Sequence, residues 1–168
     1  MASGATGITI RPIEPGDAGF VREECERHWG GVQIWSLGRM YPADELPGFL
    51  ALDDGTPAGF VTYFLQPGGY QCEVVTLSVR PEGRGVGTRL LEAAVGAAHG
   101  AGCSRVFLTT TNDNLRAIGF YQKRGWRLAA LHKGFVDEAR SRYPFIPAVG
   151  PSGIAIHDEI ELELWLRQ

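Results

Sequence analysis

The apolar positions of the N-terminal half predict a strand, a helix and then a group of strands. Isoleucines in residues 8–13 indicate an opening strand. The apolar spacing from about 18 to 28 indicates a helix that Asp17 can cap and Gly30 can end. Residues 31–47 show no regular period and are expected to be irregular. Turn-forming residues then separate three strand-like segments of an antiparallel meander, at 48–52, 58–65 and 71–79.

The pattern changes to a helical period after the meander and then returns to strands. Apolar residues between 90 and 98 recur on one helix face. The expected elements are a helix from about 85–88 to Gly100, a strand at 106–111, a helix from the Asn112–Asn114 cap to about Gly125, and a strand at 126–131. Alternating strands and helices of this kind are typical of strand–helix–strand units. The sequence therefore predicts a single α/β domain with a mixed sheet of the α+β kind.

The last part of the chain departs from short connections. Residues 134–158 carry a possible helix at 136–142, followed by several Pro and Gly residues. Loops longer than about 12–15 residues are often lids or binding loops. From 160 to 166 a leucine or isoleucine alternates with glutamate or tryptophan, which predicts a closing strand with one face in solvent.

Composition and charge narrow the class of protein. The chain has 168 residues, 44% of them apolar, and a net charge of −3, which excludes intrinsic disorder and disfavours a nucleic-acid partner. Three separated cysteines indicate buried free thiols, and the four histidines lack metal-ligand spacing, so no metal is expected. The start, residues 1–7, lacks the features of a signal peptide, and the apolar runs are too short to span a bilayer. We expect a cytoplasmic protein without a membrane partner, as a monomer or homodimer.

A glycine-rich segment at 82–88 lies between a predicted strand and a predicted helix. Its glycines allow the backbone to approach a ligand closely, and the N–H groups at a helix start carry partial positive charge. Together these features predict a phosphate cradle. The alternative is a plain glycine-rich turn. The segment lacks the Lys-Ser/Thr pair of a Walker A loop and the spacing of a dinucleotide fingerprint.

Three residues of the second predicted helix share one face, since Asn114, Ala117 and Tyr121 are spaced three and four apart. The phenol of Tyr121 is a candidate to protonate a sulfur leaving group. The alternative is a capping asparagine with a core tyrosine.

These motifs together resemble the GNAT superfamily of acyl-CoA-dependent N-acyltransferases. The resemblance rests on the run L-S-V-R-P-E-G-R-G-V-G-T-R-L-L, on N-x-x-A-x-x-x-Y and on G-W-R-L. The cofactor loop of the family falls on 82–87, with Glu82 where Arg or Gln is usual, and a second register would start at Arg80. The resemblance implies a mostly antiparallel central sheet, flanked by helices. In that sheet a parallel pair, 71–79 and 105–110, splays to bind acyl-CoA.

The resemblance also implies acetyl-CoA as the cosubstrate and assigns roles to individual residues. The N–H of Leu77 would polarise the thioester carbonyl, and Tyr121 would be the general acid. The residues expected to bind the cosubstrate are Leu77, Val79, Gly83, Arg84, Gly85, Val86, Gly87, Thr88, Asn114 and Ala117.

Glu73 is the candidate general base, because some members of the family carry a carboxylate at the corresponding place. It lies four residues before Leu77 and is expected on the same strand face. A carboxylate buried beside the substrate has a raised pKa, which suits a base near neutral pH. The alternative is a solvated or ion-paired glutamate. Ser36 and Ser78 show no obvious base partner in the sequence.

The acceptor is expected to be a small primary amine that attacks acetyl-CoA directly in a ternary complex. Residues 134–158 are expected to form a lid on the acceptor side, with Asp137, Glu138, His157 and Asp158 available to an ammonium group and Phe135, Tyr143 and Phe145 as walls. The other candidates are a protein-lysine or N-terminal acetyltransferase, a non-catalytic CoA-ester sensor and an unrelated nucleotide binder.

Overall fold

The computed structural model describes residues 7–167. Residues 1–6, most of the stretch that the sequence marks as lacking a signal peptide, lie outside the described residues. The elements are β1 (Ile8–Pro12), α1 (Ala18–Trp29), β2 (Gln33–Ser36), β3 (Arg39–Pro42), β4 (Gly48–Asp53), β5 (Thr56–Leu65), β6 (Gln71–Val79), α2 (Val86–Gly100), β7 (Arg105–Thr111), α3 (Leu115–Gln122), β8 (Arg127–His132), α4 (Phe135–Arg142) and β9 (Glu159–Trp165). Short 3₁₀ turns occupy Pro15–Asp17 and Ala43–Glu45.

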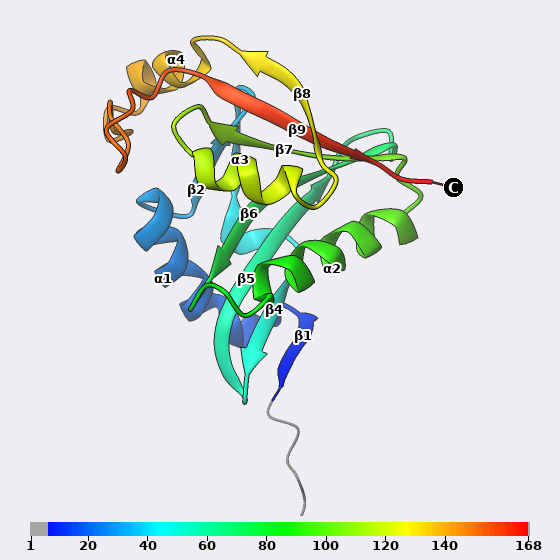
Figure 1. Cartoon of the computed structure of the whole chain (residues 1–168). Helices are drawn as coiled ribbons and strands as arrows, with labels where there is room; N and C mark the ends of the chain where they lie inside the picture. Colours follow the sequence, from blue (N-terminus) through cyan, green and yellow to red (C-terminus); the bar gives the residue numbers. More distant parts are fainter. Residues whose placement is uncertain (1–6, 168) are drawn as a thin grey trace, which may run out of the picture.

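Seven strands form the central sheet in the order β1-β4-β5-β6-β7-β9-β8. Within this sheet β6 and β7 run parallel, and the other neighbouring strands are antiparallel. The crossover between the parallel strands contains α2, as a strand–helix–strand unit requires. The expected mixed sheet, mostly antiparallel and flanked by helices, is therefore confirmed (Figure 1).

The two faces of the sheet are covered by different parts of the chain. Helix α2 packs across β1, β4, β5 and β6, and its buried residues Leu90 and Ala94 belong to a core cluster with Val61 and Val106. On the other face, Val21 and Cys25 of α1 form a second cluster with the β2–β3 hairpin and Phe60. Burial raises the pKa of the Cys25 thiol to about 11, so this cysteine stays protonated at neutral pH. We call the two sides the α2 face and the α1 face.

Residues 31–47 are not irregular, and the sequence-based expectation was wrong here. Within this range, Gln33–Ser36 and Arg39–Pro42 form the hairpin of β2 and β3, and a 3₁₀ turn follows at Ala43–Glu45. The two-residue turn of the hairpin has positive φ at Leu37 and at Gly38. Strands of four residues are too short to show a clear alternation, and a leucine with φ of 48° is uncommon in a turn. The hairpin rests on the α1 face through Ile34 and Tyr41.

The closing strand is less exposed than its alternation suggests. Because β9 lies between β7 and β8, its first glutamates are covered, and Glu159 and Glu161 are only 4% and 9% exposed. The expectation of a half-exposed strand was therefore wrong for the first half of β9, whose glutamates are buried, whereas Trp165 at its end is exposed.

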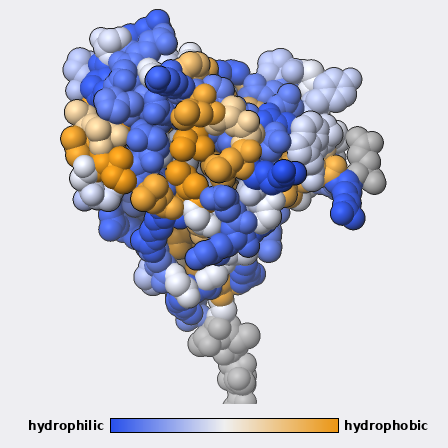
Figure 2. Space-filling model, turned by 45° about the horizontal axis from the view of Figure 1, so that its top comes forward, coloured by the Kyte–Doolittle hydropathy of each residue, from blue (hydrophilic) through white to orange (hydrophobic). Residues whose placement is uncertain are grey.

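The sheet ends at β8, which pairs with β9 on one side. Leu115 of α3 and Leu128 and Leu131 of β8 are large apolar side chains that remain exposed. Figure 2 is turned so that the top of Figure 1 comes forward, and it shows apolar side chains gathered on this side of the molecule. No helix within residues 7–167 has the length and apolar character needed to cross a membrane.

Candidate functional site

The parallel strands β6 and β7 stay together only briefly. Their ladder pairs residues 71–73 with 105–107, and beyond that point the two strands no longer pair. The rest of β6 therefore faces a gap in the sheet. Arg80 N–H donates to Ala58 O at 2.7 Å, and residues 79 and 59 are partners. Since hydrogen-bonded pairs alternate along an antiparallel ladder, the N–H groups of Leu77 and Val79 point away from β5, toward the gap.

A bulge in β6 decides which side chains reach each face. Thr62 pairs with Thr76 and Tyr63 pairs with Val74, which leaves Val75 as the extra residue. Glu73 therefore contacts the hairpin on the α1 face, whereas Leu77 packs into the cluster on the α2 face. The expectation that Glu73 and Leu77 share a strand face was wrong, because a regular alternation does not continue through a bulge.

Glu73 is 2% exposed and is held by neutral donors. Ser36 Oγ donates to Oε1, Tyr41 OH donates to Oε2 at 2.6 Å, and Gln66 Nε2 donates to Oε2 at 3.2 Å. Ser36 Oγ also lies 2.8 Å from Thr109 Oγ1 of the strand across the gap. Burial raises the pKa of the Glu73 carboxyl, and the hydrogen bonds from Ser36 and Tyr41 offset this only in part.

Glu159 is a second buried carboxylate on the same face. The N–H of Leu37, at the hairpin turn, donates to Glu159 Oε2 at 2.9 Å. Burial raises the pKa of Glu159, the Leu37 N–H and the charge of His132 offset this only in part, and the charge of Glu73 adds to the rise. The next inward-facing residue, Glu161, is different, because it is paired with Arg105 and lies 2.7 Å from His132 Nε2.

A separate buried glutamate lies where α1 meets the end of β6. Glu24 is 0% exposed, accepts a 2.5 Å hydrogen bond from Ser78 Oγ, and forms an ion pair with Arg80. His28 Nε2 lies 3.4 Å from its Oε2. Burial alone would raise the pKa of Glu24, but Ser78 and Arg80 outweigh it and the pKa is lowered. Thus Ser36 and Ser78, which lack a partner in the sequence, each donate to a buried glutamate.

The glycine-rich loop leads directly into α2. Gly83 and Gly85 have φ of 90° and 74°, and Gly85 is the N-cap of the helix without a side-chain cap. The amides of Val86, Gly87 and Thr88 in the first turn are therefore left for another acceptor. A Cβ on Gly87 would lie 3.3 Å from Phe120 and from Val79, so this glycine lets the helix pack closely.

The charged residues of the loop are engaged by neighbours. Arg84 forms an ion pair with Asp53 at the end of β4, and Glu82 forms one with Arg116 of α3. Arg80 is turned toward α1 rather than toward the loop. This placement agrees with the register that starts at Glu82.

Helix α3 brings its motif to the α2 face. Asn114 is the N-cap, and its Oδ1 accepts the N–H of Ala117 at 3.2 Å. Tyr121 is 8% exposed and lies in the cluster against which Leu77, Val79 and Ala117 pack. Burial raises the pKa of its phenol, so Tyr121 remains protonated at neutral pH.

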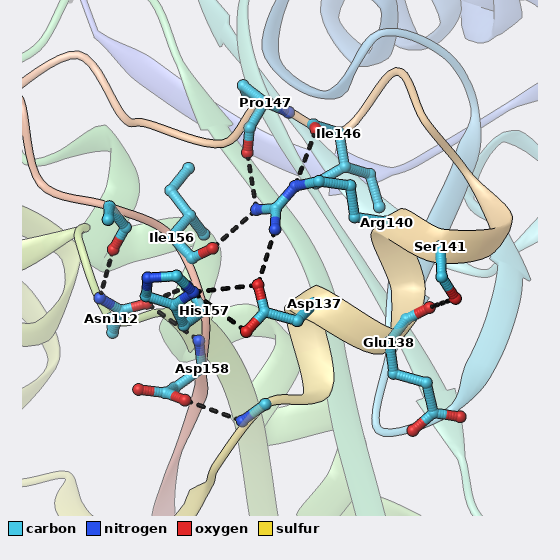
Figure 3. Close-up of polar contacts among 12 residues, drawn as sticks. Asn112, Asp137, Glu138, Arg140, Ser141, Ile146, Pro147, Ile156, His157 and Asp158 are labelled. Atoms are coloured by element: carbon cyan, nitrogen blue, oxygen red, sulfur yellow. Dashed lines mark hydrogen bonds and ion pairs between the residues drawn. The ribbon is translucent and has the colours of Figure 1, made fainter.

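Residues 134–158 form a tightly bonded segment, shown in Figure 3. Arg140 donates to three backbone carbonyls and to Asp137, and Asn112 Oδ1 accepts the N–H groups of His157 and Asp158. The polar side chains expected to meet an ammonium group have partners within the segment. Asp137 contacts Arg140 and His157, Glu138 contacts Arg142, and Asp158 accepts the N–H of Gly134.

The segment also borders the hairpin on the α1 face. The rings of Tyr143 and Trp35 lie 5.8 Å apart, and those of Tyr143 and Phe145 lie 6.0 Å apart. A surface pocket of about 430 Å³ is lined by Trp29, Gly30, Gly31, Val32, Gln33, Met40, Tyr143 and Phe145. The segment thus provides an aromatic wall on the side of the sheet that carries Glu73 and Glu159.

Within residues 7–167, no group of three or more His, Cys, Asp or Glu side chains is arranged to hold a metal. The site therefore consists of a gap in the sheet, an uncapped helix start and buried side chains on both faces.

Comparisons with known proteins agree with this arrangement. The family model for acetyltransferases of the GNAT family matches residues 17–126, more than half of the chain. The chain is 42% identical over 135 residues to the uncharacterized protein YdhI of Bacillus subtilis (strain 168), covering 80% of this chain and 83% of that protein. Its fold is similar to that of a Bacillus subtilis acetyltransferase solved in complex with CoA, with a TM-score of 0.70, 17% identity and coverage of 96% of this chain and 100% of that one.

A second solved structure, a GNAT family acetyltransferase from Elizabethkingia anophelis with acetyl-CoA bound, has a TM-score of 0.68 at 19% identity. The similarity covers 95% of this chain and 98% of that one. The chain belongs to the GNAT family of acetyltransferases.

Proposed function

We propose that the protein transfers an acetyl group from acetyl-CoA to a primary amine by direct attack in a ternary complex. The observation that carries this proposal is the gap beside β6, where the strand stops pairing with β7. One face of the strand there carries the buried carboxylate Glu73, and the other carries Leu77 beside Tyr121. The bound CoA and acetyl-CoA of the two solved relatives support the choice of cosubstrate.

The residues around the loop fit the phosphates of CoA. Positive φ at Gly83 and Gly85 and the uncapped first turn of α2 give a concave run of N–H donors. In our proposal the amides of residues 83–88 hold the pyrophosphate. The N–H groups of Leu77 and Val79, which point toward the gap, hold the pantetheine arm and the thioester carbonyl. Asn114 and Ala117 line the path along α3.

The chemical step needs a base for the amine and an acid for the thiolate. Glu73 accepts a proton from the ammonium form of the acceptor, and the amine lone pair then attacks the thioester carbonyl carbon. The N–H of Leu77 stabilises the oxyanion that forms. When the carbon–sulfur bond breaks, the phenol of Tyr121 donates its proton or a hydrogen bond to the departing thiolate.

Residues 134–158 support a small acceptor. The Arg140 contacts and the aromatic wall hold the segment beside the hairpin, which leaves less room for an extended peptide. We propose that the segment covers the acceptor side. Shortening 146–154 should abolish acetyl transfer while CoA binding is retained. Full activity after shortening, or efficient acetylation of peptide lysines without turnover of any small amine, would contradict this assignment.

The cofactor assignment is tested by thermal shift with acetyl-CoA, ATP and NAD. Acetyl-CoA should raise the Tm, and ATP and NAD should not. Gly85→Val should weaken CoA binding, because a β-branched residue does not tolerate the positive φ that shapes the cradle. Gly96→Ala is the matched control on α2, since a Cβ there meets nothing within 4 Å. Unchanged affinity in the Gly85 variant would place the pyrophosphate elsewhere.

Catalysis is tested by release of free CoA with a panel of small amines and lysine peptides. Turnover of at least one amine is expected. A protein that binds acetyl-CoA tightly but releases CoA with no amine would be the non-catalytic sensor instead. The ion pair of Glu82 with Arg116, in place of a basic residue in the loop, is the observation that favours this second candidate.

A further inference from the structure

Two of the four buried glutamates have no cationic partner within residues 7–167. Glu24 is paired with Arg80, and Glu161 is paired with Arg105. Glu73 and Glu159 receive only neutral donors, although they are 2% and 4% exposed. Burying a carboxylate is costly unless a cation compensates it.

The two carboxylates lie on one face at successive levels of the gap. Ser36 bonds to Glu73 and to Thr109, so the Glu73 carboxylate lies near the level of Thr109. Glu159 is the partner of Thr111, two residues further along β7. Two strand residues span about 7 Å. Glu73 and Glu159 also lie on the two neighbours of β7, which adds up to about 10 Å across the strands. Both side chains extend on the same face, so an extended small molecule with an ammonium group at each end can bridge the two carboxylates.

Glu159 also has hydrogen-bonding capacity that the protein does not use. Its Oε2 accepts the N–H of Leu37, and within the described part of the chain its Oε1 has no hydrogen-bond partner. Glu159 is only 4% exposed as a residue, but its unpartnered Oε1 keeps contact with the surface, unlike the fully enclosed Oε1 of Glu24. A carboxylate oxygen that can be reached and has no donor within the described residues favours a ligand that brings a charged N–H group.

We propose that the acceptor is a short aliphatic diamine, whose reacting amine is placed at Glu73 and whose second ammonium group is held by Glu159. This inference rests on the proposed acetyl transfer and narrows its substrate class. The second ammonium keeps its protons and forms no covalent bond; it neutralises Glu159 and positions the reacting amine. The hairpin turn at Leu37 orients Glu159 by its N–H.

The test compares diaminobutane with butylamine in the CoA-release assay. Wild-type protein should have a kcat/KM about 10- to 100-fold higher for the diamine, as expected for one buried charge-assisted hydrogen bond. Glu159→Gln should bring this ratio close to one. Glu163→Gln is the matched control on the same strand face, because Glu163 is already bonded to Arg105, and it should keep the ratio. Melting curves of both variants check the fold.

The outcomes separate this inference from the proposed function. Equal kcat/KM for the two amines in the wild-type protein would overturn the diamine assignment while leaving acetyl transfer intact. A diamine preference that survives Glu159→Gln would overturn the role of Glu159. If no amine releases CoA, calorimetric titration of diaminobutane into the protein–CoA complex tests the diamine site by itself. Binding that depends on Glu159 without CoA release from any amine would sustain the diamine site and reject acetyl transfer. Neither binding nor release would reject both.

Discussion

Two regions of the α1 face bury glutamates in opposite ways. At the end of β6, Glu24 is surrounded by Arg80 and Ser78, and its pKa is lowered. In the middle of the same face, Glu73 and Glu159 receive only neutral donors, and the pKa of each is raised. The first arrangement joins α1 to the sheet. The second leaves charge without an ion pair and compensated only in part, by Arg39 near Glu73 and His132 near Glu159. A protein retains such charge at a cost to stability where a ligand or a reaction needs it.

The largest expected effect is a difference in kcat between variants of the two regions. Glu73→Gln keeps the shape of the side chain but removes the proton acceptor, so kcat should fall about 100- to 10,000-fold. Glu24→Gln should leave kcat per folded molecule within about twofold, because Glu24 lies on α1 and is fully engaged by Ser78 and Arg80 at the end of β6. Steady-state CoA release at a temperature where both variants are folded makes the comparison. Equal losses in the two variants would remove the distinction between them.

Tyr121 is another buried titratable group and lies on the opposite face of the strand. Its phenol is neutral, and its raised pKa makes it a weaker acid than a thiol of ordinary pKa near 8.5. It therefore assists the departing thiolate mainly as a hydrogen-bond donor. We expect Tyr121→Phe to lower kcat about 10- to 100-fold with acetyl-CoA affinity nearly unchanged. Wild-type kcat in the variant would mean that Tyr121 only packs the core.

The two regions should respond to substitution with opposite changes in stability. Groups with a raised folded-state pKa stabilise the fold below the unfolded pKa and lose that contribution as pH rises. Glu73→Gln removes a buried charge that forms no ion pair and that Arg39 offsets only in part, and it should raise the Tm at pH 7.5 by about 2–6 °C. At pH 4 this gain should disappear.

The contribution of Glu24 to folding stability has the opposite pH dependence. Its pKa is lowered, so the contribution is present above the unfolded pKa and is lost as pH falls. Glu24→Gln should lower the Tm at pH 7.5 by about 3–8 °C, and the loss should shrink toward pH 4. Calorimetric melting of both variants at the two pH values measures these shifts. A Tm change of the same sign in both variants at pH 7.5 would break the comparison.

The smallest expected effect is on the pH profile. The kcat/KM for acetyl transfer should rise with pH as Glu73 loses its proton, with a midpoint above that of an ordinary glutamate because its pKa is raised. The other charges near Glu73 are Arg39, which lowers its pKa, and Glu161, which raises it. Glu159→Gln removes a further negative charge and should move this acid limb to lower pH by about 0.3–1 unit. Profiles from pH 5 to 9 measure the shift. An unmoved or raised midpoint would show that the two carboxylates do not interact.

The sequence predicts the sheet, the crossover helix and the cofactor loop because these depend on local period and on glycine positions. The α2 face follows the helical spacing of residues 90–98, and the loop follows Gly83 and Gly85, whose φ values no other residue type adopts as easily. The start of α3 was also predicted, because asparagine is a common N-cap residue and Asn114 is the N-cap of this helix.

The proposed acceptor side was predicted less well because it depends on contacts between distant segments. The hairpin that carries Ser36 and Tyr41 has strands of four residues, and nothing local shows that both side chains reach Glu73. The burial of Glu159 follows from the position of β9 between two strands, which the alternation of residues alone does not reveal. The available signal was the series of glutamates that alternate along β9, beside the threonines at the end of β7.

The bulge at Val75 makes the length of β6 as important as its side chains. Deleting Val75 would restore a regular alternation and keep Glu73 and Leu77 on opposite faces, because they would then be three residues apart. One residue more between Glu73 and Leu77 would instead turn one of the two side chains to the other face. The composition of the strand would hardly change, yet the proposed base and the side chain of Leu77 would no longer serve opposite sides of the sheet. Single-residue insertions between 73 and 77 should therefore be selected against more strongly than the deletion of Val75. Among homologous sequences, an inserted residue in this part of the strand is expected to mark a change or loss of activity.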